Sequence, residues 1–284
     1  MWFADWVNQA NGMKSRFLHW LALSAMIAAV SWSGCSTVPV TGRSQLTLLS
    51  PSEEMQLGLA SFEQIKKETP ISKDAAANAL VQKVGKRIAA VAGPDMPNAQ
   101  WEFVVFDSKD ANAFCLPGGK VGVYTGILPI TKDESGLATV IGHEIAHAVA
   151  RHGGERVSEA MLIQGVGNLL GAGLSKTDPA WQAVGATAYG LTTTLGRELP
   201  HSRAQESEAD QMGLHYMARA GFDPEAAVQF WQRFAAFNQQ QGGATPAFLR
   251  THPTDETRIR QLKEWMPQAK AEYERARSGN PGRL

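Results

Sequence analysis

His143-Glu144-Ile145-Ala146-His147 is the most informative segment of this 284-residue chain. Two histidines four positions apart lie about 40° apart around a helix, so both imidazoles can reach one ion. Glu144 leans toward the same ion without ligating it. Zinc held by such a pair lowers the pKa of its water, and Glu144 can take that water's proton. The pentapeptide therefore predicts a catalytic zinc site that hydrolyses amide bonds.

The sequence around the pentapeptide predicts a buried helix over residues 133–152. Asp133 or Ser135 can cap its start. His152 lies about 140° around the helix from His147, so we expect it to point away from the ion and to be structural. Apolar residues recur every four positions beside the two histidines, which is the spacing of a core-facing helix: Leu137, Ile141, Ile145 and Val149.

A second stretch supplies the third ligand that a catalytic zinc site needs beside an open position. Residues 202–210, with the sequence SRAQESEAD, begin another predicted helix, in which Glu206 and Asp210 share a face. Glu206 suits the third ligand. Asp210, one turn further on, suits an acceptor for the second ring nitrogen of a ligand histidine. The sequence therefore predicts one zinc ion per chain, bound by His143, His147 and Glu206.

HEIAH followed by SRAQESEAD resembles the HtpX-like zinc metallopeptidases, which are relatives of the CAAX prenyl proteases. The resemblance implies zinc ligands at His143, His147 and Glu206, a general base at Glu144, and a bystander at Glu208. It also implies an α+β, mainly helical fold, with a zincin-type (gluzincin) domain and a small sheet beside the active-site helix. Within the family, the chain is most similar to the periplasmic lipoprotein members.

A segment before the pentapeptide resembles the family's N-A-x-x-x-P-G-G strand, which lies beside the cleft. It begins at Asn112 and ends at Lys120. We expect Asn112, Ala113 and Phe114 to bind extended substrate backbone by strand addition, which selects conformation more than sequence.

Thr251-His252-Pro253, with Arg258 six residues after the histidine, resembles the family's H-P-x-x-x-x-R element. His252 and Arg258 are candidates for stabilising the oxyanion. Relatives suggest instead that His252 occupies the open zinc position and holds the enzyme latent. The plainest alternative is a surface loop histidine that precedes a proline.

Residues 1–35 are predicted to be a signal peptide that ends in a lipobox. Positive charge at Lys14 and Arg16 precedes a largely apolar run, and small residues precede Cys35. The run is shorter than the ~20 residues that span a bilayer, which favours a signal peptide over an anchor helix. We expect translation to start at Met13 and Cys35 to carry lipid, which would anchor the protein in the periplasm, to the outer membrane. The alternatives are simple secretion and an uncleaved anchor.

The remaining chain is expected to form a tether over 36–51, a metallopeptidase domain over 52–268 and a flexible tail over 269–284. Two apolar, glycine-rich segments, 161–174 and 180–195, are too short to be convincing membrane spans and are expected to form a helical hairpin near the cleft. Strands are predicted at 101–107 and 120–124, and further helices at 52–68, 73–92, 155–172, 180–196, 202–220, 223–237 and 254–266.

Composition limits the classes of function. A formal net charge of zero with 44% hydrophobic residues suits one globular domain with a sizeable core. The balanced charge gives no electrostatic reason to expect nucleic acid as a partner. Because Cys35 is assigned to lipid, Cys115 is expected to be a buried thiol.

These features together predict a zinc-dependent endopeptidase of the bacterial envelope that acts in protein quality control on unfolded or misassembled envelope proteins. Its expected partners are polypeptide substrates, the membrane through the N-terminal lipid, and the envelope assembly machinery. An alternative from another class is a lipid-anchored chaperone or scaffold with structural zinc. A third interpretation is an enzyme that cuts prenylated peptides, which the lack of convincing membrane spans disfavours.

Overall fold

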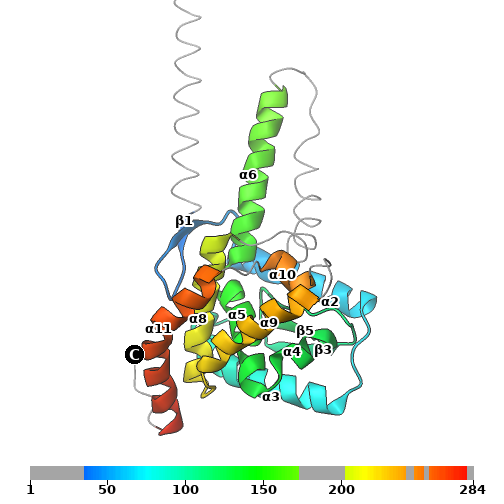
Figure 1. Cartoon of the computed structure of the whole chain (residues 1–284). Helices are drawn as coiled ribbons and strands as arrows, with labels where there is room; N and C mark the ends of the chain where they lie inside the picture. Colours follow the sequence, from blue (N-terminus) through cyan, green and yellow to red (C-terminus); the bar gives the residue numbers. More distant parts are fainter. Residues whose placement is uncertain (1–34, 173–201, 241–245, 253–255, 280–284) are drawn as a thin grey trace, which may run out of the picture.

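A computed structural model describes residues 35–172, 202–240, 246–252 and 256–279 (Figure 1). These residues are mainly helical with small sheets, which confirms the expected α+β class. The elements in chain order are β1 (Cys35–Thr37), β2 (Ser44–Leu46), α2 (Pro51–Glu68), α3 (Ala75–Ala92), β3 (Glu102–Phe106), β4 (Ala113–Leu116), β5 (Lys120–Tyr124), α4 (Leu128–Thr131), α5 (Glu134–Val149), α6 (His152–Ala172), α8 (Arg203–Arg219), α9 (Glu225–Gln240), α10 (Ala247–Thr251) and α11 (Glu256–Arg277).

The two central helices, α5 and α8, cross at very close range. α5 is buried from Gly136 to Val149, and the Asp133 side chain caps its start by accepting a hydrogen bond from the Gly136 nitrogen. A Cβ atom added at Gly142 would lie 3.0 Å from the carbonyl oxygen of Gly213 on α8. Glycine permits this close approach of two backbones. The crossing places the histidines of α5 opposite the carboxylates of α8.

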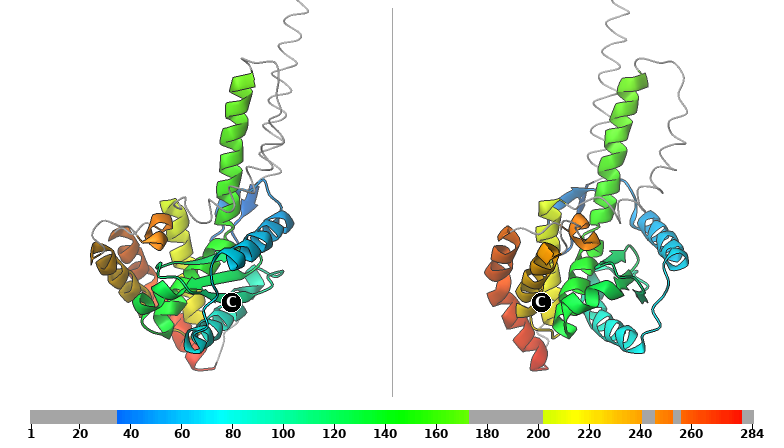
Figure 2. Two further views of the ribbon diagram at one scale, coloured as in Figure 1. Left: turned by 90° about the vertical axis from the view of Figure 1, so that its right-hand side faces the viewer. Right: turned by 45° about the vertical axis from the view of Figure 1, so that its right-hand side comes forward.

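The three-stranded sheet has the order β3-β5-β4. β3 runs parallel to β5 and β4 runs antiparallel to it, so β4 is an edge strand, and it packs against α5. α2 covers one face of the sheet, while α3 and α5 cover the other (Figure 2). An aromatic cluster joins α2 to the sheet, and it consists of Phe62, Phe106, Phe114 and Tyr124. This packing fixes the height of β4 above the active-site helix.

The segment that we expected to be a free tether, 36–51, is docked on the domain. β1 and β2 pair as an antiparallel hairpin, and Arg43 in its turn forms ion pairs with Glu155 on α6 and Glu208 on α8. The backbone nitrogen of Leu48 donates to the Ser158 hydroxyl at 2.8 Å. A polar, glycine-containing sequence is typical of a linker. Here the segment is held against the domain because Arg43 binds two buried carboxylates.

The C-terminal helix is longer than expected. α11 continues to Arg277, so the predicted tail over 269–284 is helical for its first half. Ala269 is fully buried, and Glu272 accepts from His215 of α8 at 2.8 Å and from Arg219 at 3.2 Å. These contacts with α8 stabilise a stretch whose charged composition suggested a frayed end.

α6 follows α5 after a break in the helix at Arg151, whose φ is 57°, and it projects from the body of the molecule (Figure 1). The second arm of the expected hairpin, 180–195, and the signal segment before Cys35 lie outside the described residues. Among the described helices, none is both long and apolar enough to cross a membrane.

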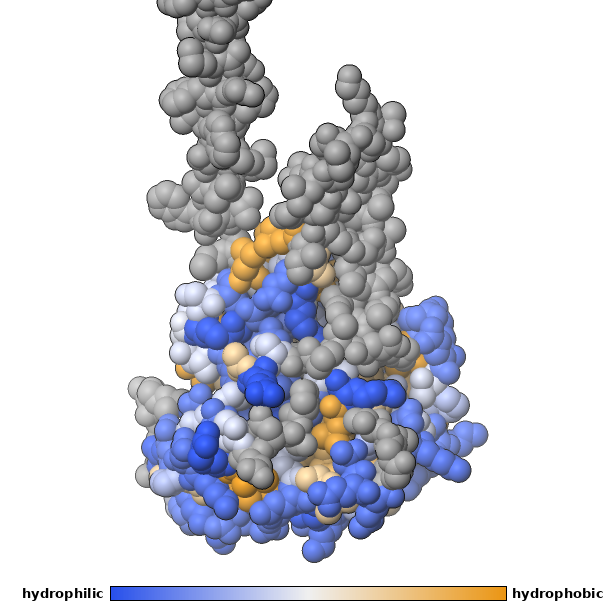
Figure 3. All heavy atoms as spheres, turned by 45° about the horizontal axis from the view of Figure 1, so that its top comes forward, coloured by the Kyte–Doolittle hydropathy of each residue, from blue (hydrophilic) through white to orange (hydrophobic). Residues whose placement is uncertain are grey.

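The surface of the described body is largely hydrophilic on the face that Figure 3 shows. Some large apolar side chains are exposed within the described residues. They are Val40, Leu48, Leu59, Ile71 and Leu162.

Candidate active site

Four buried side chains that suit a metal ion meet where α5, α8 and the end of α10 converge. His143, His147, Glu206 and His252 each offer one ligand atom, and these atoms lie within 4.8 Å of one another. Nε2 of His143 is 3.0 Å from Nε2 of His147 and 3.2 Å from Nδ1 of His252. Oε1 of Glu206 is 3.2 Å from Nε2 of His147. The structure thus brings together the three predicted ligands and adds His252 to them.

These distances fit zinc. Ligand atoms around a tetrahedral ion with bonds of about 2.0–2.1 Å are roughly 3.3 Å apart, which is close to the separations in this cluster. Three imidazole nitrogens and one carboxylate form a donor set that suits zinc. Burial opposes ionisation of Glu206, but the charges of His252 and Arg258 outweigh it and hold the pKa of this carboxyl well below its usual range. Glu206 is therefore an anionic donor.

Asp210 lies where the sequence predicted an acceptor for a ligand histidine. Its Oδ1 is 2.9 Å from Nδ1 of His143, so the Nε2 atom of that ring remains directed at the cluster. Burial lowers the pKa of His143, but hydrogen bonds to Asp210 and Glu206 outweigh it and raise the pKa to about 9. The cluster therefore attracts positive charge to this position.

Arg258 lies behind the ligands and not in the cleft. Its guanidinium bonds both oxygens of Asp210, lies 2.9 Å from Oε2 of Glu206, and stacks on the indole of Trp231 with 3.5 Å between its Cζ atom and the ring centroid. Arg258 does not line the cleft beside Glu144. The Arg258 charge is thus engaged by two carboxylates, and its expected role in stabilising the oxyanion stays a prediction.

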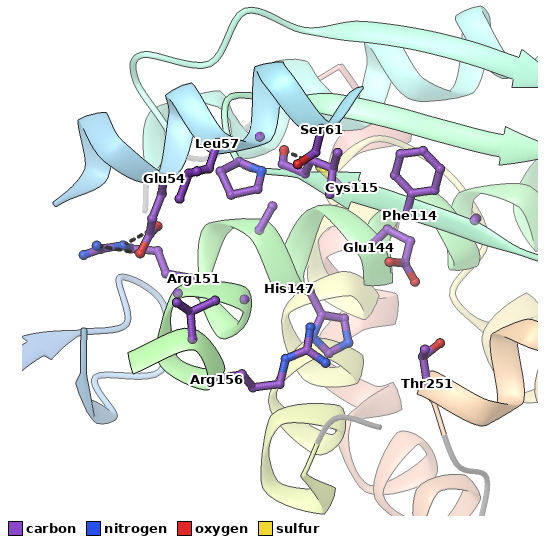
Figure 4. Close-up of a pocket in the computed structure, with 18 of the residues that line it drawn as sticks. Glu54, Leu57, Ser61, Phe114, Cys115, Glu144, His147, Arg151, Arg156 and Thr251 are labelled. Atoms are coloured by element: carbon purple, nitrogen blue, oxygen red, sulfur yellow. Dashed lines mark hydrogen bonds and ion pairs between the residues drawn. The ribbon is translucent and has the colours of Figure 1, made fainter. Parts of the chain in front are cut away.

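A cleft adjoins the cluster between α2, β4 and the end of α10. Figure 4 shows Glu144 and His147 extending from α5 into this cleft. Glu144 is 4% exposed, and burial raises the pKa of its carboxyl. Oε1 of Glu144 lies 3.4 Å from Nε2 of His252. Glu144 is thus close to the ligands without being one of the four clustered groups, as the sequence predicted.

The edge strand β4 forms one wall of the cleft. Asn112, Ala113 and Phe114 all line the cleft, but the ring of Phe114 also packs edge-on against Phe62 in the aromatic cluster. Its backbone and not its ring is therefore the part that remains for a substrate. Cys115 also lines the cleft and is only partly buried. Burial and the charge of Glu144 raise the pKa of the Cys115 thiol, so it stays protonated.

A sequence model of peptidase family M48 matches residues 75–266 of the chain. The chain belongs to peptidase family M48. It is 36% identical over 271 residues to the mitochondrial metalloendopeptidase OMA1 of Schizosaccharomyces pombe. That alignment covers 94% of this chain and 77% of the relative. The Saccharomyces cerevisiae protein of the same name is 32% identical, covering 97% of this chain and 83% of the relative.

A bacterial relative is the beta-barrel assembly-enhancing protease of Escherichia coli, which is 27% identical over 82% of this chain and 48% of the relative. M48 membership confirms that the chain is a zinc metallopeptidase with polypeptide substrates. We expected greatest similarity to the bacterial lipoprotein members, but the mitochondrial relatives match at higher identity over more of the chain.

Two residues are connected to the ligands of this site in ways that were not predicted from the sequence. His152 does not point away from the ligands, since its Nδ1 is 2.7 Å from Nδ1 of His147. The extrapolation around one helix fails because α5 ends at Val149 and the positive φ of Arg151 changes the chain direction before His152. Glu208 is no bystander either, because its carboxylate lies 2.9 Å from Nε2 of His152. No local pattern signals this contact, since Glu206 and Glu208 lie on different sides of an ideal helix.

Proposed function

We propose that the chain is an envelope metalloendopeptidase that cleaves unfolded or misassembled polypeptides. The observation that carries this proposal is the convergence of His143, His147 and Glu206 beside a cleft whose wall is an edge strand, with His147 lining that cleft. When bound, zinc supplies a Lewis acid that polarises the scissile carbonyl and lowers the pKa of water. These three side chains would hold it.

Glu144 is the proposed general base. It is buried beside the ligands and extends into the cleft, so it can take a proton from the attacking water and later pass it to the leaving amine. A carboxyl with a raised pKa suits both steps, because it holds and releases protons nearer to neutral pH. No other acid lines the cleft within the described residues apart from Glu54, which is bonded to Arg151 at 2.9 Å.

The outer edge of β4 is the proposed binding site for substrate backbone. β4 bonds β5 along one side only, so within the described residues its second side is free to pair with an extended chain. Main-chain pairing of this kind recognises an unfolded segment with little regard for its side chains. Asn112 and Ala113, at the start of the strand, lie on the cleft wall and would contact such a segment.

His252 is the proposed latch of this site. Its Nδ1 lies 2.9 Å from Oε1 of Glu206 and 3.2 Å from Nε2 of His143, and the residue is 3% exposed. A side chain placed among the ligands favours the latent arrangement over oxyanion stabilisation, because it occupies the position that a substrate needs. Arg258 is then a positioning residue that holds Glu206 and Asp210.

We further propose that lipid on Cys35 anchors the protein in the periplasm, at the outer membrane. The support is the signal-like sequence over 13–35 and the bacterial relative whose name refers to beta-barrel assembly. Components of the envelope assembly machinery are then candidate partners. The β1–β2 hairpin begins at Cys35 itself, so an anchored protein would hold its domain close to the membrane.

A Glu144→Gln variant tests the proposed function. It should bind zinc as tightly as the wild type while cleavage of casein falls by about 10²–10⁴-fold, and it should retain envelope substrates for identification by mass spectrometry. A scaffold with structural zinc is the alternative, since four protein ligands are typical of structural sites. Undiminished casein cleavage by the variant, or no proteolytic activity in either the wild type or His252→Ala, would rule the proposed mechanism out.

A further inference from the structure

A chain of polar contacts connects the candidate zinc ligand His147 to the N-terminal hairpin. Nδ1 of His147 meets Nδ1 of His152 at 2.7 Å, and Nε2 of His152 meets Oε2 of Glu208 at 2.9 Å. The same Oε2 atom accepts from Nε of Arg43 at 2.7 Å, and Oε1 of Glu208 accepts from the Thr41 hydroxyl. His152 is fully buried and Glu208 is 6% exposed.

The hydrogen positions along this chain follow from what each atom can do. A carboxylate only accepts, so Nε2 of His152 carries hydrogen and donates to Glu208. A neutral imidazole then has a lone pair on Nδ1 of His152, which accepts the hydrogen on Nδ1 of His147. This tautomer leaves the lone pair of His147 on Nε2, the atom that faces His143 and Glu206.

The two ligand histidines are thus oriented by different means. His143 donates directly to Asp210, which is the common arrangement of a carboxylate, a histidine and a metal. For His147 the carboxylate acts through an inserted imidazole, and Arg43 holds that carboxylate in place. Arg43 also bonds both oxygens of Glu155, at 2.7 and 2.9 Å, so its guanidinium is fixed between two helices.

We propose that Arg43, Glu208 and His152 form a positioning relay that fixes the tautomer and orientation of His147 for metal binding. The relay makes the β1–β2 hairpin part of the metal site, although Arg43 and Glu208 are 165 positions apart in sequence. The proposal rests on the proposed ligand role of His147. None of the three relay residues lines the cleft, so we expect their effect to be on metal binding and not on substrate binding.

Zinc affinity tests the relay, measured on the full chain by competition with a chromophoric chelator. His152→Phe keeps a ring but no nitrogen, and it should weaken zinc binding by about 10–100-fold, as is typical for partners of metal ligands. Glu208→Gln should weaken zinc binding less than His152→Phe does, and Arg43→Met should weaken it less again. The visible absorption of the cobalt-substituted protein should also change in His152→Phe, because the ring of His147 loses its fixed orientation.

Glu272→Gln is the matched control. Glu272 is a buried carboxylate of α11 that binds a histidine and an arginine, as Glu208 does, but it lies away from the cluster. This variant should leave zinc affinity unchanged. If Glu272→Gln loses as much zinc affinity as the relay variants do, lowered stability explains the loss in all of them, and the relay is overturned.

His147→Ala separates this proposal from the proposed ligand set. If His147→Ala loses zinc while the relay variants keep wild-type affinity and an unchanged cobalt spectrum, the relay is wrong and the ligand set stands. If His147→Ala keeps its zinc, the ligand assignment itself is wrong. Should His152→Phe fail to fold, Glu208→Gln decides, since it preserves the size and shape of the side chain.

Discussion

A Cβ atom at Gly213 of α8 would lie 2.8 Å from the backbone nitrogen of His143 on α5. The absence of a side chain at Gly213 therefore sets the distance between the helix that carries the ligand histidines and the helix that carries Glu206. Because protein interiors are close-packed, a change of even one methyl group at this crossing must displace one helix.

Gly213→Ala should lower zinc affinity and stability together. The added methyl group meets backbone, which cannot rotate away, and overpacking of this kind typically costs about 1–3 kcal/mol. Urea unfolding and a chelator competition assay would measure the two effects. Gly153→Ala is the control, because a Cβ there meets nothing within 4 Å. Wild-type zinc affinity in Gly213→Ala would contradict this expectation and show that the two helices can move apart without disturbing the zinc ligands.

Glu206→Ala should remove most of the bound zinc. It takes away the anionic ligand and also leaves the buried charge of Arg258 with one carboxylate fewer. Loss of metal should lower stability, since metal binding is coupled to folding. Metal content by mass spectrometry and thermal unfolding would report this, with Glu264→Ala on the exposed face of α11 as the control. Full zinc occupancy in Glu206→Ala would exclude it as a ligand.

His252→Ala should raise basal cleavage of casein if the histidine is a latch. Its removal frees a position among the ligands while His143, His147 and Glu206 remain. If His252 instead stabilises the oxyanion, the same substitution should lower kcat by about 10²-fold. Steady-state kinetics at saturating zinc distinguish the outcomes by their sign, and unchanged kinetics would assign neither role.

Glu272→Gln should lower the free energy of unfolding in a pH-dependent manner. Burial opposes ionisation of Glu272, but hydrogen bonds from His215 and Arg219 outweigh it and lower the pKa of the carboxyl. The ionised form therefore stabilises the fold at pH values above about 4.3, the usual glutamate pKa, and this stabilisation is lost as pH falls through the lowered pKa. We expect a difference of about 1.5–3 kcal/mol between wild type and variant at pH 7.

Urea unfolding at pH 7 and at progressively lower pH would test this dependence. The two stabilities should converge as the pH falls below 4, because the wild-type carboxyl then becomes neutral like the amide. A difference that stays constant across this range would show that charge on Glu272 contributes nothing.

Cys35→Ala should release the protein from the membrane fraction if the cysteine is lipidated. Cleavage of soluble casein should be unchanged, since Cys35 lies at the start of β1 and outside the active-site cluster. Intact-mass analysis of the membrane-extracted wild type should give a chain that begins at Cys35 with added acyl mass. An unmodified mature chain would refute the anchor.

Much of the site could be predicted because it depends on local helix geometry. His143 and His147 share one face of α5, and Glu206 and Asp210 share one face of α8, simply because residues four apart do so in any helix. Spacing rules fail where the helix geometry changes or where distant segments meet. His152 follows a break in the helix at Arg151, and Arg258 contacts carboxylates from another helix.

The residues that can bind zinc were predictable from the amino-acid sequence, since ligand chemistry and helical spacing are both properties of short segments. How those ligands are held depends on tertiary packing. The contact of Arg43 with Glu208 joins segments that are 165 positions apart, and it exists because a polar hairpin found buried carboxylates on α6 and α8. Such contacts depend on which surfaces pack together, and packing is a property of the whole chain, so no local pattern encodes it.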